Sequence, residues 1–438
     1  MNAAPGPASA ASVAVVGAGP AGLAAAFAAA EHGARVLLFD RNPEPGCKLL
    51  LTGGGRCNVT NAKDIADFIP AYFGNGRFLH PAFRSLSNLD TIRLFENLGV
   101  PLTKDDGGKL FPRSDTAADI RDALVSACRT AGVVFRMGER VLGLDPLRDG
   151  EDGAPGYRLK TDRERQGIIA AAVVIATGGL SWPATGSTGD GLRWAERLGI
   201  GIVPPRPGLA PLTCTNPWIR GLAGVSVDPV RAELVRKDRD GQDSLAGKAE
   251  GPLLFTHRGI SGPAVLRLSR NLPKPWAEGE SYRVRLNLLP GTGGEELDRI
   301  AAGRFAAYPR RDAANALEGL LPASLLQAVV RLHSGGEMPK AGVVTREQRR
   351  EILRGLQAAE LTVARPASYG EAMVTAGGIA LSDIDPRTMG VRAWPGLHAA
   401  GEVLDIDGDT GGYNLQAAFS TGTLAGLNAA ASALRDQK

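Results

Sequence analysis

Three glycines near the start of the chain, Gly17, Gly19 and Gly22, have the spacing G-x-G-x-x-G. An apolar run at residues 13–16 precedes them, an alanine-rich stretch follows, and an acid, Asp40, lies 18 positions after the third glycine. In such a strand–turn–helix–strand unit, the glycines allow a tight turn, close approach of a pyrophosphate and close helix–strand packing, and the acid accepts from a ribose hydroxyl. The helix start attracts phosphate through its free N–H groups and its dipole. The pattern predicts dinucleotide binding, with a glycine-rich helix start that binds nothing as the alternative.

A second glycine-rich segment, residues 46–61, combines three consecutive glycines with basic and amide side chains. Glycines in a row cannot pack a core, and they expose backbone N–H groups. Arg56, Asn58 and Asn61 add side-chain donors beside them. Exposed N–H groups of this kind suit a loop that wraps along an anionic ligand. The alternative is a mobile surface loop.

Long segments spread over most of the chain resemble motifs of the YhiN/BaiN-like flavoproteins, a bacterial branch of the two-dinucleotide-binding-domain flavoproteins. The segments are GCKLLLTGGGRCNVTN, GKLFPRSDTAADI, ATGGLSWPATGSTGDG, FTHRGISGPAVLRLSR, AMVTAGGIALSDIDPRTM and GLHAAGEVLDIDGDTGGYNLQAAFSTG. The resemblance implies bound FAD and a Rossmann-like domain interrupted by a β-barrel and a small helical domain. It also implies an oxidoreductase, and some relatives are assigned the reduction of conjugated carbon–carbon double bonds in steroid-like enones.

The resemblance also implies roles for individual residues. It places the turn at Thr177 and Gly178, which follows an apolar run, near the FAD. In related flavoproteins an acid in the position of Glu402, after Gly401, accepts a hydrogen bond from the flavin ribitol chain, although many relatives outside this branch carry Asp there. The expected cofactor-binding residues are Gly17, Gly19, Pro20, Ala21, Gly22, Asp40, Arg41, Lys48, Gly54, Gly55, Arg56, Cys57, Asn58, Thr177, Gly178, Gly401, Glu402, Gly411, Gly412, Tyr413, Asn414 and Leu415.

The cluster at residues 410–414 is expected to start a helix that runs to about residue 434. Its free N–H groups and positive dipole charge, aimed at the pyrimidine edge of a flavin, would stabilise the reduced ring and raise its potential. Gly411 and Gly412 have no β-carbon, which lets the chain come close to the ring. An ordinary surface helix with a glycine start is the alternative.

The elements that position these residues indicate an α/β protein, with a Rossmann-like FAD-binding domain interrupted by two inserts. The prolines at residues 204–207 mark the exit from the first domain. The expected parts are a disordered tail at 1–11, an FAD-binding domain at 12–203 and 361–438, a β-barrel-like insert at 204–290 and a helical insert at 291–360. Locally, Ser87 is expected to cap a helix that ends at Gly99, and residues 102–111 are expected to form a hairpin.

Three side chains are candidates for chemistry beside the FAD. His257 lies in one of the family-like segments, and histidine is a common proton donor near neutral pH, with a structural histidine as the alternative. Tyr413, at the helix start on the flavin side, is a second candidate proton donor. Cys57 is a candidate redox thiol, with a packed or hydrogen-bonded thiol as the alternative.

Composition limits the classes of partner. The formal net charge of the 438 residues is +4, which does not indicate a polyanion partner, and the arginines at 310–311 and 346–354 are interpreted as solvated helix faces. None of the four cysteines forms C-x-x-C, so no metal site is indicated, and scattered thiols suit a reducing cytoplasm. No uninterrupted apolar stretch reaches the roughly 18 residues of a membrane span. We therefore expect a cytoplasmic protein without nucleic-acid or membrane partners, and the oligomeric state stays open.

The sequence as a whole predicts an FAD-dependent oxidoreductase. It would pass a hydride through flavin N5 from NADH or NADPH to a small organic acceptor, with a conjugated enone as a candidate substrate. No second nucleotide fingerprint marks a stable nicotinamide site, so this donor is expected to bind transiently. Two alternatives stay open: a flavin-carrying binding or sensor protein without turnover, and a nucleic-acid-modifying flavoenzyme, which needs a coherent basic surface.

Overall fold

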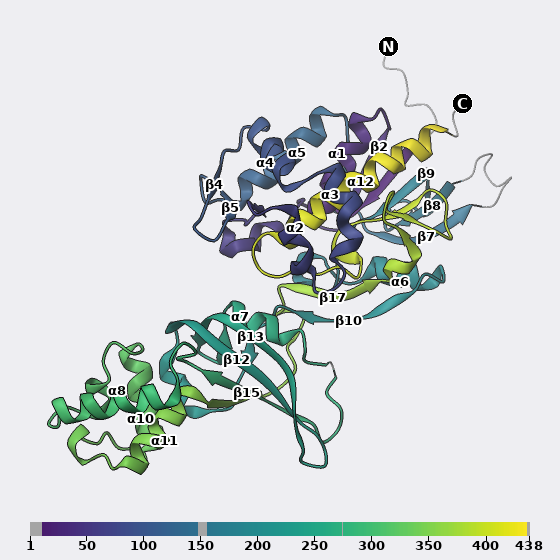
Figure 1. Ribbon diagram of the computed structural model, residues 1–438. Helices are drawn as coiled ribbons and strands as arrows, with labels where there is room; N and C mark the ends of the chain where they lie inside the picture. The colour runs from purple at the N-terminus through teal and green to yellow at the C-terminus, as the bar shows by residue number, and fades with distance from the viewer. Residues whose placement is uncertain (1–10, 148–155, 274, 436–438) are drawn as a thin grey trace. The chain divides into compact units, whose positions relative to one another are not determined.

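The computed structural model describes residues 11–147, 156–273 and 275–435, and the chain divides into two compact units (Figure 1). The first unit contains residues 1–205 and 374–438, and the second contains residues 206–373. Each unit has its own hydrophobic core. All of the expected tail at 1–11 except Ala11, which begins strand β1, lies outside the described residues.

The first unit is built on a nine-stranded sheet with the order β18-β19-β20-β9-β1-β2-β6, to which β8 and β7 are joined beside β9. Its strands are β1 (Ala11–Val16), β2 (Val36–Asp40), β6 (Val134–Met137), β7 (Val141–Leu147), β8 (Gly156–Thr161), β9 (Ile168–Ile175), β18 (Ile384–Asp385), β19 (Gly390–Val391) and β20 (Leu397–Ala399). The strands β20, β9, β1, β2 and β6 run parallel. A crossover connection between parallel strands starts at the carboxyl end of the first strand. The glycine-rich segments that follow β1 and β2 therefore begin at the carboxyl end of this sheet.

Helices and two smaller sheets complete this unit. The helices are α1 (Pro20–Glu31), α2 (Ile65–Phe68), α3 (His80–Ser85), α4 (Asn88–Asn97), α5 (Ala117–Thr130), α6 (Asp190–Arg197) and α12 (Tyr413–Arg435). The strands β3 (Thr60–Asn61), β5 (Lys109–Pro112) and β4 (Leu102–Lys104) form one small sheet, and β10 (Ile202–Gly208) with β17 (Val374–Ile379) forms the other. The prolines expected to mark a domain exit therefore lie within a strand of a two-stranded ribbon, where missing N–H donors are tolerated.

Backbone-to-backbone packing joins α1 to α12. A β-carbon on Gly422 would lie 2.3 Å from the carbonyl oxygen of Ala21, and one on Gly426 would lie 2.2 Å from that of Ala25. Two glycines one helical turn apart thus let the last helix lie against the helix of the glycine-rich turn, as Figure 1 shows. Nearly all of α1 is buried, which explains its run of alanines.

The second unit is built on a six-stranded antiparallel sheet with the order β11-β14-β13-β12-β15-β16. Its strands are β11 (Leu212–Thr213), β12 (Ser226–Lys237), β13 (Asp243–Thr256), β14 (Gly259–Ser261), β15 (Ser281–Asn287) and β16 (Ala359–Thr362). Thr215 N donates to Thr362 O at 3.0 Å and Ala364 N donates to Thr213 O at 2.8 Å. These bonds join the two edge strands, so the sheet closes on itself in the manner of a barrel.

Five helices accompany this sheet, and α8, α10 and α11 gather at one end of it in Figure 1. They are α7 (Pro263–Ser269), α8 (Gly294–Ala307), α9 (Ala313–Ala316), α10 (Ala323–His333) and α11 (Arg346–Gln357). Residues 361–373 were expected in the FAD-binding domain. They belong instead to the second unit, because β16 pairs with β15 and the chain leaves that unit only at residue 373.

No helix in the described part of the chain combines the length and the apolar character that a membrane span needs.

His398 in β20 is a buried titratable side chain of the first unit. Its Nδ1 lies 3.1 Å from the carbonyl oxygen of Thr388, and its Nε2 has no hydrogen-bond partner among the described residues. Burial lowers the pKa of His398 to about 4, so the imidazole is neutral in the folded protein at neutral pH.

We predict that the first unit loses stability as the pH falls from about 6.5, the ordinary histidine pKa, to about 4. In that window the unfolded chain binds a proton that folded His398 does not bind. The free energy of unfolding therefore decreases as the pH decreases, by at most about 1.4 kcal/mol per pH unit from this group. Urea unfolding at neutral and mildly acidic pH should show a weaker pH dependence for His398→Leu than for the wild type. The exposed-histidine control His80→Gln should behave as the wild type, and an unaltered slope in His398→Leu would contradict the assignment.

Candidate functional site

The turn between β1 and α1 has three glycines in three different environments. A β-carbon on Gly17, whose φ is +105°, would lie 2.3 Å from the carbonyl oxygen of Ala176, and one on Gly22 would lie 1.7 Å from the carbonyl oxygen of Gly17. A β-carbon on Gly19 would meet nothing within 4 Å. The first and third glycines are therefore required by the protein itself, whereas the open space at Gly19 suits the approach of a ligand.

Asp40 at the end of β2 is tied to this turn. Its Oδ2 accepts from Ala18 N at 2.8 Å, and its Oδ1 accepts from Asn42 N at 2.8 Å. Burial raises the pKa of the Asp40 carboxyl, against the lowering effect of these two N–H donors. A carboxylate has about four acceptor sites, so Asp40 can hold the turn and still accept from a ribose hydroxyl.

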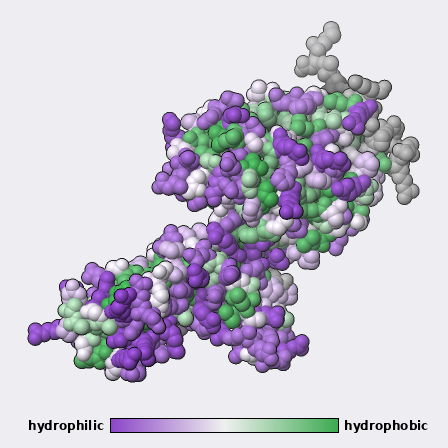
Figure 2. All heavy atoms as spheres, in the orientation of Figure 1, coloured by the Kyte–Doolittle hydropathy of each residue, from purple (hydrophilic) through white to green (hydrophobic). Residues whose placement is uncertain are grey.

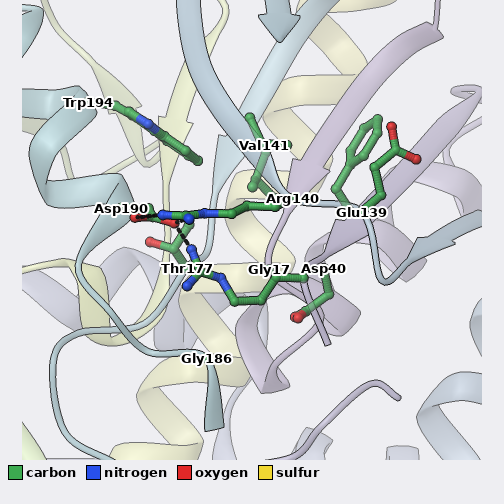
Figure 3. A pocket seen from close by; sticks show the side chains of 12 residues that line it. Gly17, Asp40, Glu139, Arg140, Val141, Thr177, Gly186, Asp190 and Trp194 are labelled. Atoms are coloured by element: carbon green, nitrogen blue, oxygen red, sulfur yellow. Dashed lines mark hydrogen bonds and ion pairs between the residues drawn. The ribbon is translucent and has the colours of Figure 1, made fainter. Parts of the chain in front are cut away.

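A narrow pocket lies beside Asp40 (Figure 3). The side chains of Arg140 and Asp190 line this pocket and point toward each other. It is lined by Val16, Gly17, Phe39, Asp40, Arg41, Glu139, Arg140, Val141, Thr177, Gly186, Asp190 and Trp194. This lining brings together four residues that the sequence assigned to the cofactor from three separate segments, namely Gly17, Asp40 with Arg41, and Thr177.

Three arginines converge on the buried carboxylate of Asp190, the first residue of α6. Arg140 Nη2 donates to its Oδ1 at 3.1 Å, and Arg41 and Arg193 also donate to it. Two of these arginines line the pocket together with two further acids, Asp40 and Glu139, so its lining carries no excess of positive charge. Among Asp190 and the three arginines that donate to it, only Arg41 was predicted from the sequence. The signal that could have pointed to Asp190 is its place in the glycine cluster TGSTGDG.

The loop after β2 exposes backbone in the way its composition predicts. Gly53, Gly54 and Gly55 have φ of +59°, +69° and +92°, and β-carbons on Gly54 and Gly55 would meet nothing within 4 Å. The left-handed conformation of three consecutive residues explains why all three are glycine. Arg56 beside them lies over the ring of Phe111, 4.6 Å from its centroid.

A polar network links this loop to the end of β20. Lys48 Nζ donates to Glu402 Oε2 at 2.5 Å and to Ser181 Oγ at 2.5 Å, and Ser181 Oγ donates to Glu402 Oε1 at 2.6 Å. Thr375 N also donates to Glu402 Oε1 at 2.8 Å. The network fixes the carboxylate expected to hold a ribitol chain. Sequence reasoning found Lys48 and Glu402 but missed Ser181 and Thr375, which carry no signal of their own.

The start of α12 packs closely against β3. A β-carbon on Gly412 would lie 2.5 Å from the backbone of Thr60, and Gly412 N donates to the amide oxygen of Asn58 at 3.0 Å when that amide is oriented to donate to Thr60 O. The glycine is therefore needed for packing on β3, and a flavin is not required to explain it. Asn414 accepts from Gly408 N at 2.8 Å and donates to Gly408 O at 2.7 Å, so it holds the preceding loop.

The candidate catalytic residues lie in different surroundings. The ring of Tyr413 is buried against Phe68, with centroids 4.9 Å apart, and its carbonyl accepts from the Tyr72 hydroxyl at 2.8 Å. His257 is exposed on the turn between β13 and β14 of the second unit. Burial raises the pKa of Cys57 to about 12, so its thiol stays protonated at neutral pH, as a packed thiol would.

The remaining predicted residues all belong to the first unit. Gly178 has a φ of +69°, and Gly401 has a φ of +75° and donates its N–H to Thr421 Oγ1 at 3.0 Å. Pro20 and Ala21 form the first turn of α1, and Leu415 lies in the first turn of α12. Within the described residues, no cluster of three or more His, Cys, Asp and Glu side chains has the arrangement of a metal site.

Comparison with known proteins places this geometry in a family. The model of the HI0933-like protein Rossmann domain matches residues 11–428. The ribosomal RNA dihydrouridine synthase of Escherichia coli (strain K12) is 34% identical over 414 residues, which cover 93% of this chain and 95% of that protein. The 3-dehydro-bile acid delta(4,6)-reductase of Clostridium scindens is 30% identical over 421 residues, 95% of this chain and 98% of that protein.

Solved structures show the same fold. The 3-ketosteroid delta1-dehydrogenase of Sterolibacterium denitrificans aligns with a TM-score of 0.54 at 13% identity and covers 97% of this chain and 100% of its own. The open conformation of a flavocytochrome c3 fumarate reductase aligns with a TM-score of 0.51 at 20% identity, over 98% of this chain and 79% of its own. The expected Rossmann-like α/β fold is thereby confirmed.

We predict that Asp40→Ala weakens FAD binding by roughly 1.5–3 kcal/mol, the usual range for hydrogen bonds to a charged group. The flavin absorbance spectrum should hardly change, because the adenosine half of the cofactor is remote from the ring. FAD titration of the apoprotein measures the effect. Asp40→Asn, which keeps one acceptor oxygen and the shape of the turn, should lose less, and Asp122→Ala, an exposed acid paired with Arg121, should lose nothing. An unaltered Kd in Asp40→Ala would remove Asp40 from the ribose site.

Proposed function

This chain belongs to the HI0933-like family of Rossmann-domain proteins, as an FAD-dependent oxidoreductase, and we propose that it reduces a carbon–carbon double bond conjugated to a carbonyl group. The observation that carries the proposal is full-length similarity to two proteins whose names describe that reaction on different substrates. Dihydrouridine is uridine with its C5–C6 bond saturated, beside the C4 carbonyl. A delta(4,6)-reductase of a 3-dehydro bile acid saturates bonds in conjugation with the 3-oxo group.

The first unit offers the parts that such an enzyme needs to hold FAD. The open space at Gly19 suits the pyrophosphate, Asp40 suits the adenosine ribose, and Glu402, held by Lys48, suits the ribitol chain. When bound, FAD supplies a hydride at N5 for the β-carbon of the conjugated system. NADH or NADPH is the proposed source of the electrons, and with a single nucleotide fingerprint in the chain this donor binds transiently.

The α-carbon of the substrate must receive a proton. We assign this role first to His257, which lies in the family-like segment FTHRGISGPAVLRLSR, and second to Tyr413, whose ring is enclosed by Phe68 and Tyr72. A positioned proton donor contributes about 10²–10⁴-fold to such reactions. Cys57 has no part in the proposal, because its thiol is buried and protonated.

Uridine in ribosomal RNA is a second candidate substrate beside a small enone. Proteins of Escherichia coli and Haemophilus influenzae, 34% and 32% identical to this chain, are named for it. The expectation that nucleic acid is not a partner therefore has no support. The reactive groups are alike in both substrates, so the choice between them rests on how the rest of the substrate is held.

We predict that NADH or NADPH reduces the bound FAD and that a conjugated acceptor reoxidises it. Under anaerobic conditions the flavin absorbance should bleach with the nicotinamide and return in proportion to added 3-oxo-Δ4 steroid or to uridine-containing RNA. Mass spectrometry of the product should show a gain of two hydrogens. If neither acceptor restores the absorbance, the alternative of a flavin-carrying sensor without turnover becomes the better description.

We predict that His257→Gln lowers kcat by about 10²–10⁴-fold, the range for loss of a proton donor. FAD affinity and the rate of flavin reduction by the nicotinamide should not change, because neither needs that proton. His80→Gln, which removes an exposed histidine of α3, is the matched control. Full activity of His257→Gln would transfer the proton donor to Tyr413 or to water.

A further inference from the structure

The second unit contains a groove that the proposed chemistry does not use. It lies between the helices α10 and α11 and the strands β15 and β16, and its volume is about 790 Å³. This is within the range of about 300–1,000 Å³ that small-ligand pockets occupy. The residues that give it chemical character are Trp218, Arg285, Leu332, His333, Arg354 and Glu360.

The groove is held open by the packing of its own walls. His333 at the end of α10 lies against α11, where a β-carbon on Gly355 would be 2.3 Å from its Nε2. The helices therefore approach each other at this point and leave the groove beside it. Burial lowers the pKa of His333, so the imidazole is neutral at neutral pH.

One side of the groove offers apolar and aromatic surface. Trp218 is half-buried, and its ring lies 6.3 Å from the centroid of Phe255, which holds the indole in place. Leu332 is 47% exposed although it is a large apolar side chain. A fixed aromatic ring with apolar neighbours is the kind of surface on which nucleobases stack.

The other side offers guanidinium groups that a phosphate can reach. Arg354 is 69% exposed and pairs with exposed Glu351 at 2.5 Å, and Arg285 is 40% exposed and pairs with Glu360 at 3.1 Å. An exposed ion pair contributes little to stability, so an anion can displace Glu351 from Arg354 at little cost. Arg285 is held more firmly, because it also lies 3.8 Å from Glu233 and shares Glu360 with Arg283. Arginine is suited to phosphate because of its planar set of donors.

Charge is divided unequally between the two units. The second carries 24 lysines and arginines against 18 aspartates and glutamates, and the first carries 26 against 28. The net charge of +4 therefore conceals a basic unit beside a slightly acidic one. In the face shown in Figure 2, the helical end of the second unit is largely hydrophilic with small hydrophobic patches. The arginines at 346–354, which the sequence analysis interpreted as a solvated helix face, all lie on α11.

We propose that this groove binds a single-stranded segment of an RNA substrate, with a base against Trp218 and the backbone phosphates at Arg354 and Arg285. The inference rests on the proposed function with RNA as the substrate. A steroid-like molecule fits the groove less well, because two guanidinium groups line it. The groove thus holds RNA at the unit that does not bind FAD.

The test is fluorescence anisotropy of a fluorescein-labelled oligouridine with the FAD-loaded full chain. Arg354→Glu should weaken binding by about tenfold and lower the slope of log affinity against log salt by about 0.7, the value for one lost phosphate contact on a single strand. Arg231→Glu is the matched control, because Arg231 is another exposed arginine of this unit, paired with Glu250 at 3.0 Å, and does not line the groove. It makes the same change in net charge and should alter affinity less than about twofold.

Tryptophan fluorescence gives a second readout that does not depend on charge. Oligouridine should quench the wild type, and Trp218→Phe, which keeps an aromatic ring, should bind with similar affinity but lose the quenching. Equal weakening by Arg354→Glu and Arg231→Glu, quenching that persists in Trp218→Phe, or absence of binding by the wild type overturns the proposal. Competition by a 3-oxo-Δ4 steroid would also overturn it.

Failure of this inference is distinguishable from failure of the proposed function. Reduction of uridine by a chain whose groove variants bind RNA normally would overturn the groove and keep the reaction. If oligouridine binds in the groove but no conjugated acceptor reoxidises the flavin, the proposed RNA-binding groove is supported and the proposed reduction of a conjugated double bond is rejected. Reduction of FAD by the nicotinamide should be the same in Arg354→Glu and the wild type.

Discussion

The contact of backbone with backbone at the start of α1 is the constraint on which the first unit depends. Gly17 lies against the carbonyl of Ala176, and Gly22 lies against the carbonyl of Gly17, at distances that exclude any β-carbon. The turn is thereby fixed where β1, β2 and β9 all end. Ligands of open α/β sheets bind at that edge, so the same packing that stabilises the fold places Asp40 where a dinucleotide would bind.

Ionic networks then give the site its charge, at a cost in desolvation. Asp190 is 8% exposed and Glu402 sits between Lys48 and Ser181, so neither carboxylate is left without donors. Removing a partner from a buried pair destabilises strongly, because a charge remains unpaired.

The sequence predicts what is local and misses what joins distant segments. The glycine spacing gave the roles of Gly17 and Gly22, Ser87 caps its helix through a capping box, and β4 and β5 form the expected hairpin. Lys48 and Glu402 are 354 positions apart, and no pattern states that they pair. The packing of Gly412 on Thr60 was likewise not predicted, because Thr60 lies in a strand far earlier in the chain.

Separate cores explain how one family can act on unlike substrates. The chain enters the second unit at residue 206, within β10, and returns to the first unit at β17. The second unit has its own core and its own closed sheet, so its surface can change without disturbing the glycine-rich turn. A synthase of dihydrouridine in RNA and a bile acid reductase each align with at least 93% of this chain. What must differ is the surface that holds the remainder of the substrate, and the basic balance of residues 206–373 in this chain favours a polyanion there.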